Sequence, residues 1–357
     1  MKRAHRKLSV VIPAAAIVVL ALLTFAGPAL ANIVINGAGA TFPMPLYYQW
    51  EHSYYSYTHK AVQVNYQGIG SGGGIAAIEN GVVMFGASDA PLTPDGLKTN
   101  SLVQFPMCVG GVVPVVHING IGAGDLKLTG PVLAQIYMGT IQYWNDSQIK
   151  KLNPTVASKL THARIVVVHR LDASGTTWIY THYLQAVYPS FPFADKTGTW
   201  PAGQLGGNGN AGVAGLVQQH TNSIGYVEYA YAKSNNIPYA QMKNRSGRYV
   251  SPTLKSFGAA LKGTKWSAST GFVTLLVNRP GKKVWPITGS TFILIKMTMS
   301  SYDTAHAMLK FFDWAYNNKD ARASATKLIY INMPKTVAKK VEAVWHAKVK
   351  AGGKAAW

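Results

Sequence analysis

The sequence predicts an α/β fold, because strand-like and helix-like segments alternate along most of the chain. Residues 61–67 alternate apolar and polar side chains as a half-buried strand does. The apolar run at 165–170 reads as a buried strand, and apolar residues recur at helical spacing in 176–188 directly after it. A length of 357 residues exceeds one ordinary core and favours two domains, whose sheets we expect to be largely parallel.

The remaining elements follow from start and stop signals. Residues 71–81 predict a short helix that ends at Gly81. In 129–139, Thr129 is suited to cap the helix, Pro131 lies near its first position and Gly139 ends it. We further predict a helix at 210–220, a strand plus turn at 223–232, and two C-terminal helices at 302–318 and 334–349.

The first 31 residues are typical of a secretory signal peptide. Four cations precede an apolar run at 8–26, and small residues lead to an Ala29-Leu30-Ala31 cleavage pattern. The run is also long enough to be retained as a membrane anchor, but the cleavage pattern favours removal after Ala31. We therefore expect an exported protein that begins at Asn32.

Charge and cysteine content restrict the function classes. The formal charge is +21, and +17 remains beyond residue 31 because the first 31 residues hold four cations and no acid. The cations are scattered and no nucleic-acid module is visible, so a cationic surface that attracts small anions, or adaptation to an acidic exterior, explains the balance as well. The single cysteine, Cys108, lies in an apolar run and is expected to be buried and inert. No metal-ligand spacing is present.

Four segments resemble anion-binding turns. Each is a strand followed by a turn rich in Gly, Ser or Thr that opens a helix or faces a cleft. Such turns can bind anions, because the unpaired amides at a helix start attract negative charge. The segments are 37–43, 68–74, 85–92 and 169–177. Any one of them could be an ordinary tight turn, but four together, one containing Arg170, favour a phosphate or sulfate cradle.

Other glycine-rich motifs fit less well. Gly68, Gly70 and Gly73 satisfy the dinucleotide-binding pattern, with Asp89 sixteen residues further on, but an exported protein seldom meets that cofactor. A phosphate-binding P-loop lacks its lysine, and neither Ser71 nor Ser174 lies in the hydrolase pattern G-x-S-x-G.

These residues, taken in order, closely resemble the family of phosphate-binding proteins of bacterial high-affinity ABC-type phosphate importers. The resemblance covers nearly the whole chain after residue 31. It is carried by the blocks "GAGATFPMPLYYQW", "YQGIGSGGGIAAI", "FGASDAPL", "VVHRLDASGTTWIYTHYL", "WPAGQLGGNGNAGVAGLV" and "WPITGSTFILI".

The resemblance implies a two-lobed periplasmic binding protein fold of type II, in which two α/β domains are joined by crossover hinge strands. Lobe one would combine 32–112 with 286–357, and lobe two would be 113–285. The ligand would be inorganic phosphate, captured without catalysis or cofactor and delivered to membrane permease subunits. We expect a monomer that binds no nucleic acid.

The family's ligand positions fall on the anion-directed turns. Thr41 and Phe42 would offer backbone amides, and Ser71 its amide and hydroxyl. From the other lobe, Arg170 would supply charge-assisted hydrogen bonds. In that lobe, the start of a helix at Ser174, Gly175 and Thr176 would face the phosphate.

Two acidic residues complete the implied site. Asp89, ionised, would accept a hydrogen bond from the proton that phosphate keeps near neutral pH, and would repel sulfate, which keeps none. An ordinary Asx turn before Ala90-Pro91 is the alternative reading. Asp172 would orient Arg170, although a plain surface aspartate is equally compatible with its position.

Some residues depart from the family pattern or lie outside the site. Asn208 and Ala211 stand where we expect a lysine and a glutamate, but not at ligand positions. His169 should point away from Arg170 and pack against the protein. An exported phosphatase that uses the same oxyanion clamp, and a surface scaffold that reuses the fold, remain as rival functions.

Overall fold

The computed structural model describes residues 32–357, so the predicted signal peptide lies outside the described residues. Residues Ile33–Trp357 form one compact unit. Its main element is a nine-stranded sheet with strand order β2-β1-β3-β11-β4-β8-β6-β7, in which β13 also pairs with β4. No helix within 32–357 is long and apolar enough to span a bilayer.

The strands of the main sheet are as follows: β1 (Ile33–Gly39), β2 (Val62–Gly68), β3 (Phe85–Ser88), β4 (Leu102–His117), β6 (Val166–Arg170), β7 (Leu205–Gly207), β8 (Ser223–Glu228), β11 (Thr288–Lys296) and β13 (Ile331–Asn332). Two small sheets are built from β5 (Lys127–Leu128), β9 (Gln241–Lys243) and β10 (Tyr249–Val250), and from β12 (Thr298–Met299), β14 (Lys350–Ala351) and β15 (Lys354–Ala355).

The helices are as follows: α1 (Met44–Tyr57), α2 (Ser71–Glu79), α3 (Pro94–Thr99), α4 (Gly130–Tyr137), α5 (Ser147–Leu152), α6 (Gly175–Val187), α7 (Gly209–Gln219), α8 (Tyr229–Ser234), α9 (Leu254–Ala259), α10 (Tyr302–Asn317), α11 (Lys319–Lys327) and α12 (Lys335–Lys348). Short 3₁₀ turns lie at Pro154–Val156 and Ala268–Thr270.

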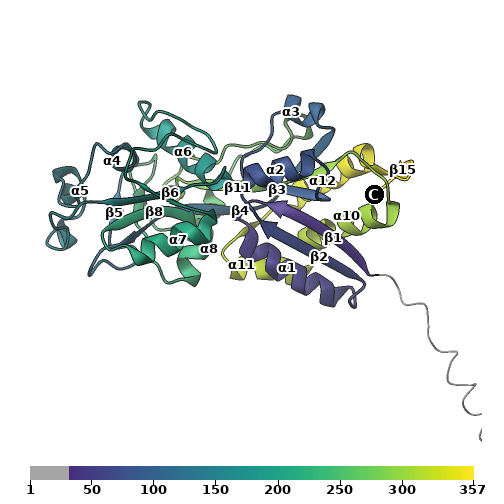
Figure 1. The fold of residues 1–357 in the computed structure, drawn as a ribbon, viewed down its shortest axis with the longest axis horizontal. Helices are drawn as coiled ribbons and strands as arrows, with labels where there is room; N and C mark the ends of the chain where they lie inside the picture. Colours follow the sequence, from purple (N-terminus) through teal and green to yellow (C-terminus); the bar gives the residue numbers. More distant parts are fainter. Residues whose placement is uncertain (1–31) are drawn as a thin grey trace, which may run out of the picture. The chain divides into compact units, whose positions relative to one another are not determined.

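The long strand β4 joins two halves of the molecule. Its residues Leu102–Gly111 pair with β11, and Val112–His117 pair with β8. Figure 1 shows β4 and β11 at the centre, with β1–β3 and the terminal helices on one side and β5, β6, β8 and α4–α8 on the other. The change of partner at Gly111/Val112 falls beside the predicted lobe boundary at 112/113. The lobe limits themselves stay a prediction.

The core forms where apolar residues face inward from both sides of the sheet. All but the last residue of β4 is buried, because helices or strands cover both of its faces. The prediction that Cys108 is buried is confirmed, since none of its surface is exposed. Met308, Phe311, Phe312 and Trp314 in α10 are likewise core residues.

The structure confirms most predicted elements, corrects two predictions and adds helices that were not predicted, among them α3, α5, α9 and α11. The sheet was predicted to be largely parallel, and this holds only on its two sides, where β1 pairs in parallel with β2 and β3, and β6 with β7 and β8. At its centre, β4 and β11 run antiparallel to each other and to their other neighbours. The turn predicted after β8 is the helix α8, which Glu228 caps by accepting from the Ala230 amide. A third C-terminal helix, α11, was not predicted; it begins after Asn318, whose side chain accepts from two of its amides.

Candidate functional site

The four anion-directed turns lie at strand ends, as predicted. β1 leads through 40–43 into α1, β2 leads into α2, and β6 leads through 171–174 into α6. The fourth turn follows β3 but does not open a helix at once, since α3 begins only at Pro94. The strand-turn-helix design is therefore present three times, and the fourth segment contributes a loop.

The turns from the two halves meet. The Ser71 hydroxyl oxygen accepts from the Gly175 amide at 3.0 Å and from the Asp89 amide at 3.2 Å. The Gly72 amide donates to the Ala173 carbonyl at 2.9 Å. A tight contact of this kind brings the starts of α2 and α6 and the end of β3 to one point.

Glycine is needed where the backbones approach most closely. A Cβ at Gly175 would lie 2.4 Å from Ser71 Oγ and 2.6 Å from Asp89 Cβ. A Cβ at Gly70 would lie 2.3 Å from Asp172 Oδ2, and Gly70 also has a φ of 82°. Both glycines permit a contact that a larger residue would prevent.

Asp89 is the unusual group of this cluster. It is 1% exposed, and neither of its carboxylate oxygens has a hydrogen-bond partner within residues 32–357. Burial raises the pKa of Asp89 to about 7, while the Arg170 guanidinium and the nearby Thr291 hydroxyl, which does not itself reach hydrogen-bond geometry with the carboxyl group, lower it. Burying a carboxyl group without a hydrogen-bond partner costs free energy of folding, which a ligand that donates to it would offset.

Arg170 lies at the end of β6 and is 4% exposed. Its Nε donates to Asp172 Oδ1 at 2.7 Å, and its Nη2 pairs with Asp172 Oδ2. Burial acts to raise the pKa of Asp172, but the hydrogen bond and charge of Arg170 outweigh it, and the pKa lies below its ordinary value. Asp172 also accepts from the Gly209 amide at 3.0 Å, so it fixes the guanidinium against α7.

The cluster also holds donors without an acceptor. Within residues 32–357, the amides of Thr41, Phe42, Ser71 and Thr176 have no hydrogen-bond acceptor. The hydroxyl of Ser71 accepts from two amides, which leaves its own proton to be donated elsewhere. Ser174 caps α6 by accepting from the Thr177 amide.

Asn210 is a residue of this region that sequence reasoning missed. It is fully buried, and its Nδ2 donates to the hydroxyls of Thr41 at 2.9 Å and Thr176 at 3.2 Å. Its Oδ1 accepts from the Glu228 amide at 2.8 Å. Asn210 thus connects turns from both halves, and no sequence motif marked it, because its role depends on contacts distant in the chain.

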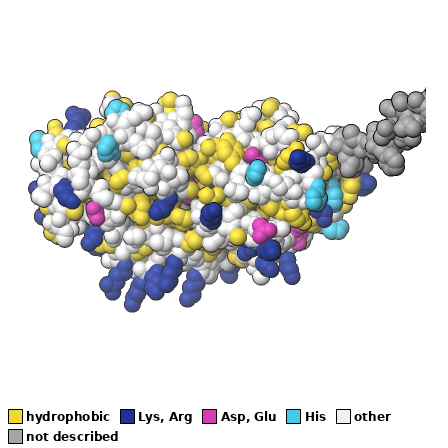
Figure 2. Space-filling model, turned by 90° about the horizontal axis from the view of Figure 1, so that it is seen from below, with side chains coloured by type: hydrophobic (Ala, Val, Ile, Leu, Met, Phe, Trp, Pro, Cys, Tyr) yellow, Lys and Arg dark blue, Asp and Glu magenta, His cyan; other side chains and the backbone are white. Residues whose placement is uncertain are grey.

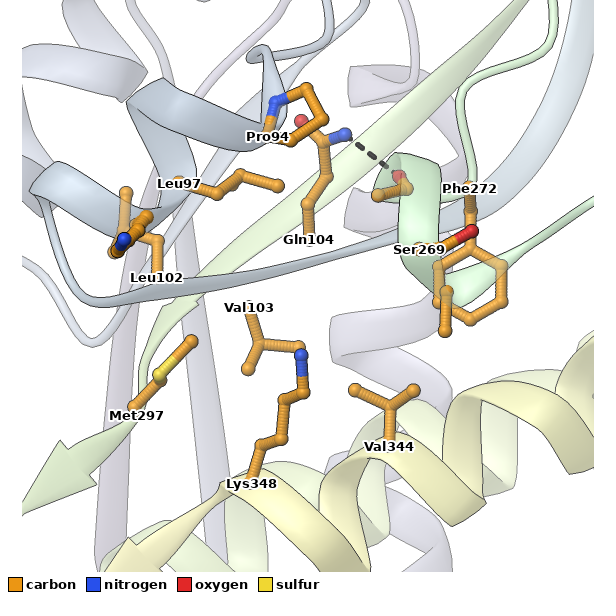
Figure 3. Close-up of a pocket in the computed structure, with 13 residues that line it drawn as sticks. Pro94, Leu97, Leu102, Val103, Gln104, Ser269, Phe272, Met297, Val344 and Lys348 are labelled. Carbon is orange, nitrogen blue, oxygen red and sulfur yellow. Dashed lines mark hydrogen bonds between the residues drawn. The ribbon is translucent and has the colours of Figure 1, made fainter.

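Several residues prove to lie outside the cluster. His169 stacks on Trp200 with ring centroids 4.9 Å apart, which confirms that it packs against the protein. Asn208 and Ala211 are both exposed, although Gly209 and Asn210 between them take part in the cluster. A separate hollow of about 330 Å³ opens beside α3, β4 and α12 (Figure 3), and none of its lining residues is a predicted ligand residue.

A sheet that passes through two α/β halves, with anion-directed turns of both halves meeting at their junction, defines a two-lobed binding protein of the periplasmic type. The model of the PBP superfamily domain matches residues 26–319. The phosphate-binding protein PstS of Pasteurella multocida is 43% identical over 327 residues, which cover 90% of this chain and 93% of that protein. The protein of the same name from Methanocaldococcus jannaschii is 34% identical and is matched over 86% of this chain and 84% of its own length.

Solved structures agree in fold. A high-affinity periplasmic phosphate-binding protein bound with phosphate superposes with a TM-score of 0.72 at 22% identity, covering 89% of this chain and 96% of the other. A phosphate ABC transporter substrate-binding protein from Clostridium perfringens gives a TM-score of 0.62 at 18% identity, covering 84% and 100%. The chain belongs to the PBP superfamily and, within it, to the family of phosphate-binding proteins named PstS.

Proposed function

We propose that this protein captures inorganic phosphate between its two lobes outside the cytoplasm and delivers it to the permease of an ABC-type importer, without catalysis. The names of the PstS relatives support phosphate as the ligand, and the name of the Clostridium perfringens protein supports an ABC transporter as the partner. The observation that carries the proposal is the buried, unpartnered carboxyl group of Asp89, which lies at the contact of Ser71 with Gly175 and is close enough to Arg170 for the guanidinium to lower its pKa.

The donors are suited to a tetrahedral oxyanion. Amides of Thr41, Phe42, Ser71 and Thr176, at or near the starts of three helices, would bind phosphate oxygens. The Ser71 hydroxyl would donate its remaining proton, and Arg170 would supply charge-assisted hydrogen bonds. Ser174 and Gly175 would hold the start of α6 in place against the anion.

Asp89 would select the ligand by its proton. Phosphate retains a proton near neutral pH and can donate it to a carboxylate, whereas sulfate is fully ionised and leaves the carboxylate unpaired. Sites built around a ligand hydroxyl discriminate by about 10⁴–10⁵ against an analogue that lacks it. We therefore expect strong preference for phosphate over sulfate.

Calorimetric titration of the purified protein with phosphate, sulfate and arsenate tests the proposal. We expect a heat of binding with phosphate at a stoichiometry of one phosphate per protein, and no heat of binding with sulfate at the same concentration. Absence of heat with phosphate would contradict the proposal and favour a scaffold that reuses the fold.

A phosphatase is the rival from another class. Among residues 32–357, no three His, Cys, Asp or Glu side chains gather as metal ligands, and the cluster holds no activated nucleophile of the kinds that phosphatases use. Turnover of a phosphomonoester in buffer supplemented with divalent metals would favour the phosphatase.

The remaining parts of the proposal concern organisation. Lobe one would be 32–112 with 286–357 and lobe two 113–285, acting as a monomer without a cofactor, metal or nucleic acid. The predicted signal peptide would place the protein in the periplasm. Mass spectrometry of the exported protein would show whether it begins at Asn32.

A further inference from the structure

The excess of positive charge comes from two parts of the chain, residues 229–302 and residues 319–357, and only the first of them holds no acid. Between residues 229 and 302 there are eleven Lys and Arg residues and no Asp or Glu. Lys243, Arg245, Arg248, Lys282 and Lys283 are all exposed, and we refer to these five residues as the basic face. The proposed phosphate site does not use any of them.

The basic face is a defined surface, because hydrogen bonds hold its two loops together. Asn244, only 5% exposed, donates through Nδ2 to the carbonyls of Gly281, Lys282 and Val284 at 3.1–3.2 Å. Its Oδ1 accepts from the amides of Ser246 and Arg248. The turn after β9 and the loop at 281–284 are therefore fixed side by side.

The charges of this face are not neutralised within the protein. Within residues 32–357, only Arg170 and Lys196 lie within 4.0 Å of a carboxylate, so no member of the basic face forms an ion pair there. Figure 2 shows Lys and Arg side chains that project next to one another along one edge of the molecule, without Asp or Glu between them. Unneutralised like charges repel one another, so a cluster of this kind favours an anionic partner.

The residue types of the basic face favour a lipid surface over a protein as its partner. Protein interfaces depend on buried aromatic and apolar anchors, and lysine is depleted in them. In 229–302, all of which the structure describes, the one large apolar side chain that is strongly exposed is Leu275. Long, flexible cations without an apolar anchor suit a mobile layer of phosphate headgroups, which needs no shaped pocket.

We propose that the basic face docks the protein on the anionic phospholipid surface of the membrane that carries its permease. The inference rests on the proposed function only for the choice of membrane. Each Lys or Arg near an anionic bilayer contributes about 1 kcal/mol. The basic face would hold the protein near the membrane and shorten its search for the permease.

The test compares two variants of the exported protein that lose the same charge. The first carries Arg245→Gln, Arg248→Gln, Lys282→Gln and Lys283→Gln. The matched control carries Lys319→Gln, Lys327→Gln, Lys335→Gln and Lys339→Gln, which are exposed positions on α11 and α12. Sedimentation with vesicles of phosphatidylcholine, with and without phosphatidylglycerol, measures binding.

We expect the wild type to bind only the vesicles that contain phosphatidylglycerol and to be released at high salt. The first variant should bind on the order of 10²–10³-fold more weakly, and the control less than about tenfold more weakly. Equal losses in both variants would mean that net charge alone acts and would overturn the proposal. Binding to soluble inorganic polyphosphate but not to vesicles would overturn it as well.

Phosphate titration of both variants and their thermal unfolding separate this proposal from the proposed function. Unfolding like that of the wild type shows that the variants are folded, whether or not phosphate binds. Vesicle binding without phosphate binding would overturn the proposed function alone. Phosphate binding without vesicle binding would overturn the proposal of membrane docking alone.

Discussion

Gly175→Ala should weaken phosphate binding, because the new methyl group would enter the contact between the two halves. Its Cβ would lie 2.4 Å from Ser71 Oγ, 2.6 Å from Asp89 Cβ and 2.7 Å from Asp89 Oδ2. Ser71 would have to move, and its hydrogen bonds from the amides of Gly175 and Asp89 would lengthen. Overpacking of this kind costs about 1–3 kcal/mol, which corresponds to about 5- to 150-fold weaker binding.

Titration calorimetry with phosphate measures this loss of affinity. Thermal unfolding without phosphate shows whether the substitution also destabilises the phosphate-free protein. The clash joins residues of the two proposed lobes, Ser71 and Asp89 in one and Gly175 in the other. We expect these lobes to separate when phosphate leaves, so the clash should act in the phosphate-bound protein and leave the unfolding temperature of the phosphate-free protein nearly unchanged. Gly215→Ala in α7 is the control, because a Cβ there meets no atom within 4 Å. Wild-type affinity of Gly175→Ala would refute the idea that these segments press together around the ligand.

The remaining predictions concern three charged residues, Arg170, Asp89 and Glu228. Arg170→Ala should weaken phosphate binding on the order of 10²-fold or more by removing a buried cation; calorimetry with wild-type affinity would place the site elsewhere. Asp89→Asn should reduce the preference for phosphate over sulfate, since an amide can also donate. In the wild type the same preference should fall as the pH drops below the Asp89 pKa of about 7, because a protonated carboxyl group can donate to sulfate; a preference independent of pH would count against this role. Burial raises the pKa of Glu228 from 4.5 to about 8, although hydrogen bonds from Tyr330 and Ala230 lower it. The folded state therefore holds a proton that the unfolded state has lost, and stability should decrease by a few kcal/mol as the pH rises from about 4.5 to 8. Glu228→Gln should remove that part of the decrease in denaturant unfolding, and an unchanged slope would disprove the assignment.

Local sequence signals predicted the individual elements well. Thr129, for example, caps α4 by accepting from the Val132 amide, as its position before Pro131 indicated. Signals of this kind are local, because a cap and the amide that it satisfies lie within one helical turn.

Contacts between distant segments were beyond the reach of the sequence. Asn210 bonds Thr41, 169 positions away, and Ser71 bonds Gly175, 104 positions away. Neither contact has a periodic pattern, since each depends on how β4 and β11 bring the two halves together. Likewise, the antiparallel direction of these two strands could not be read from an apolar run alone.

The sequence by itself determined which residue types stand at the strand ends: amide-rich glycine turns, one arginine and two aspartates suited to an oxyanion. Only the tertiary structure decided which aspartate does what. Asp172 pairs with Arg170 and keeps a low pKa, whereas Asp89 is buried without a partner and has its pKa raised to about 7. The physical reason is that the pKa of a carboxyl group depends on its burial and its neighbours, and these exist only once the chain has folded.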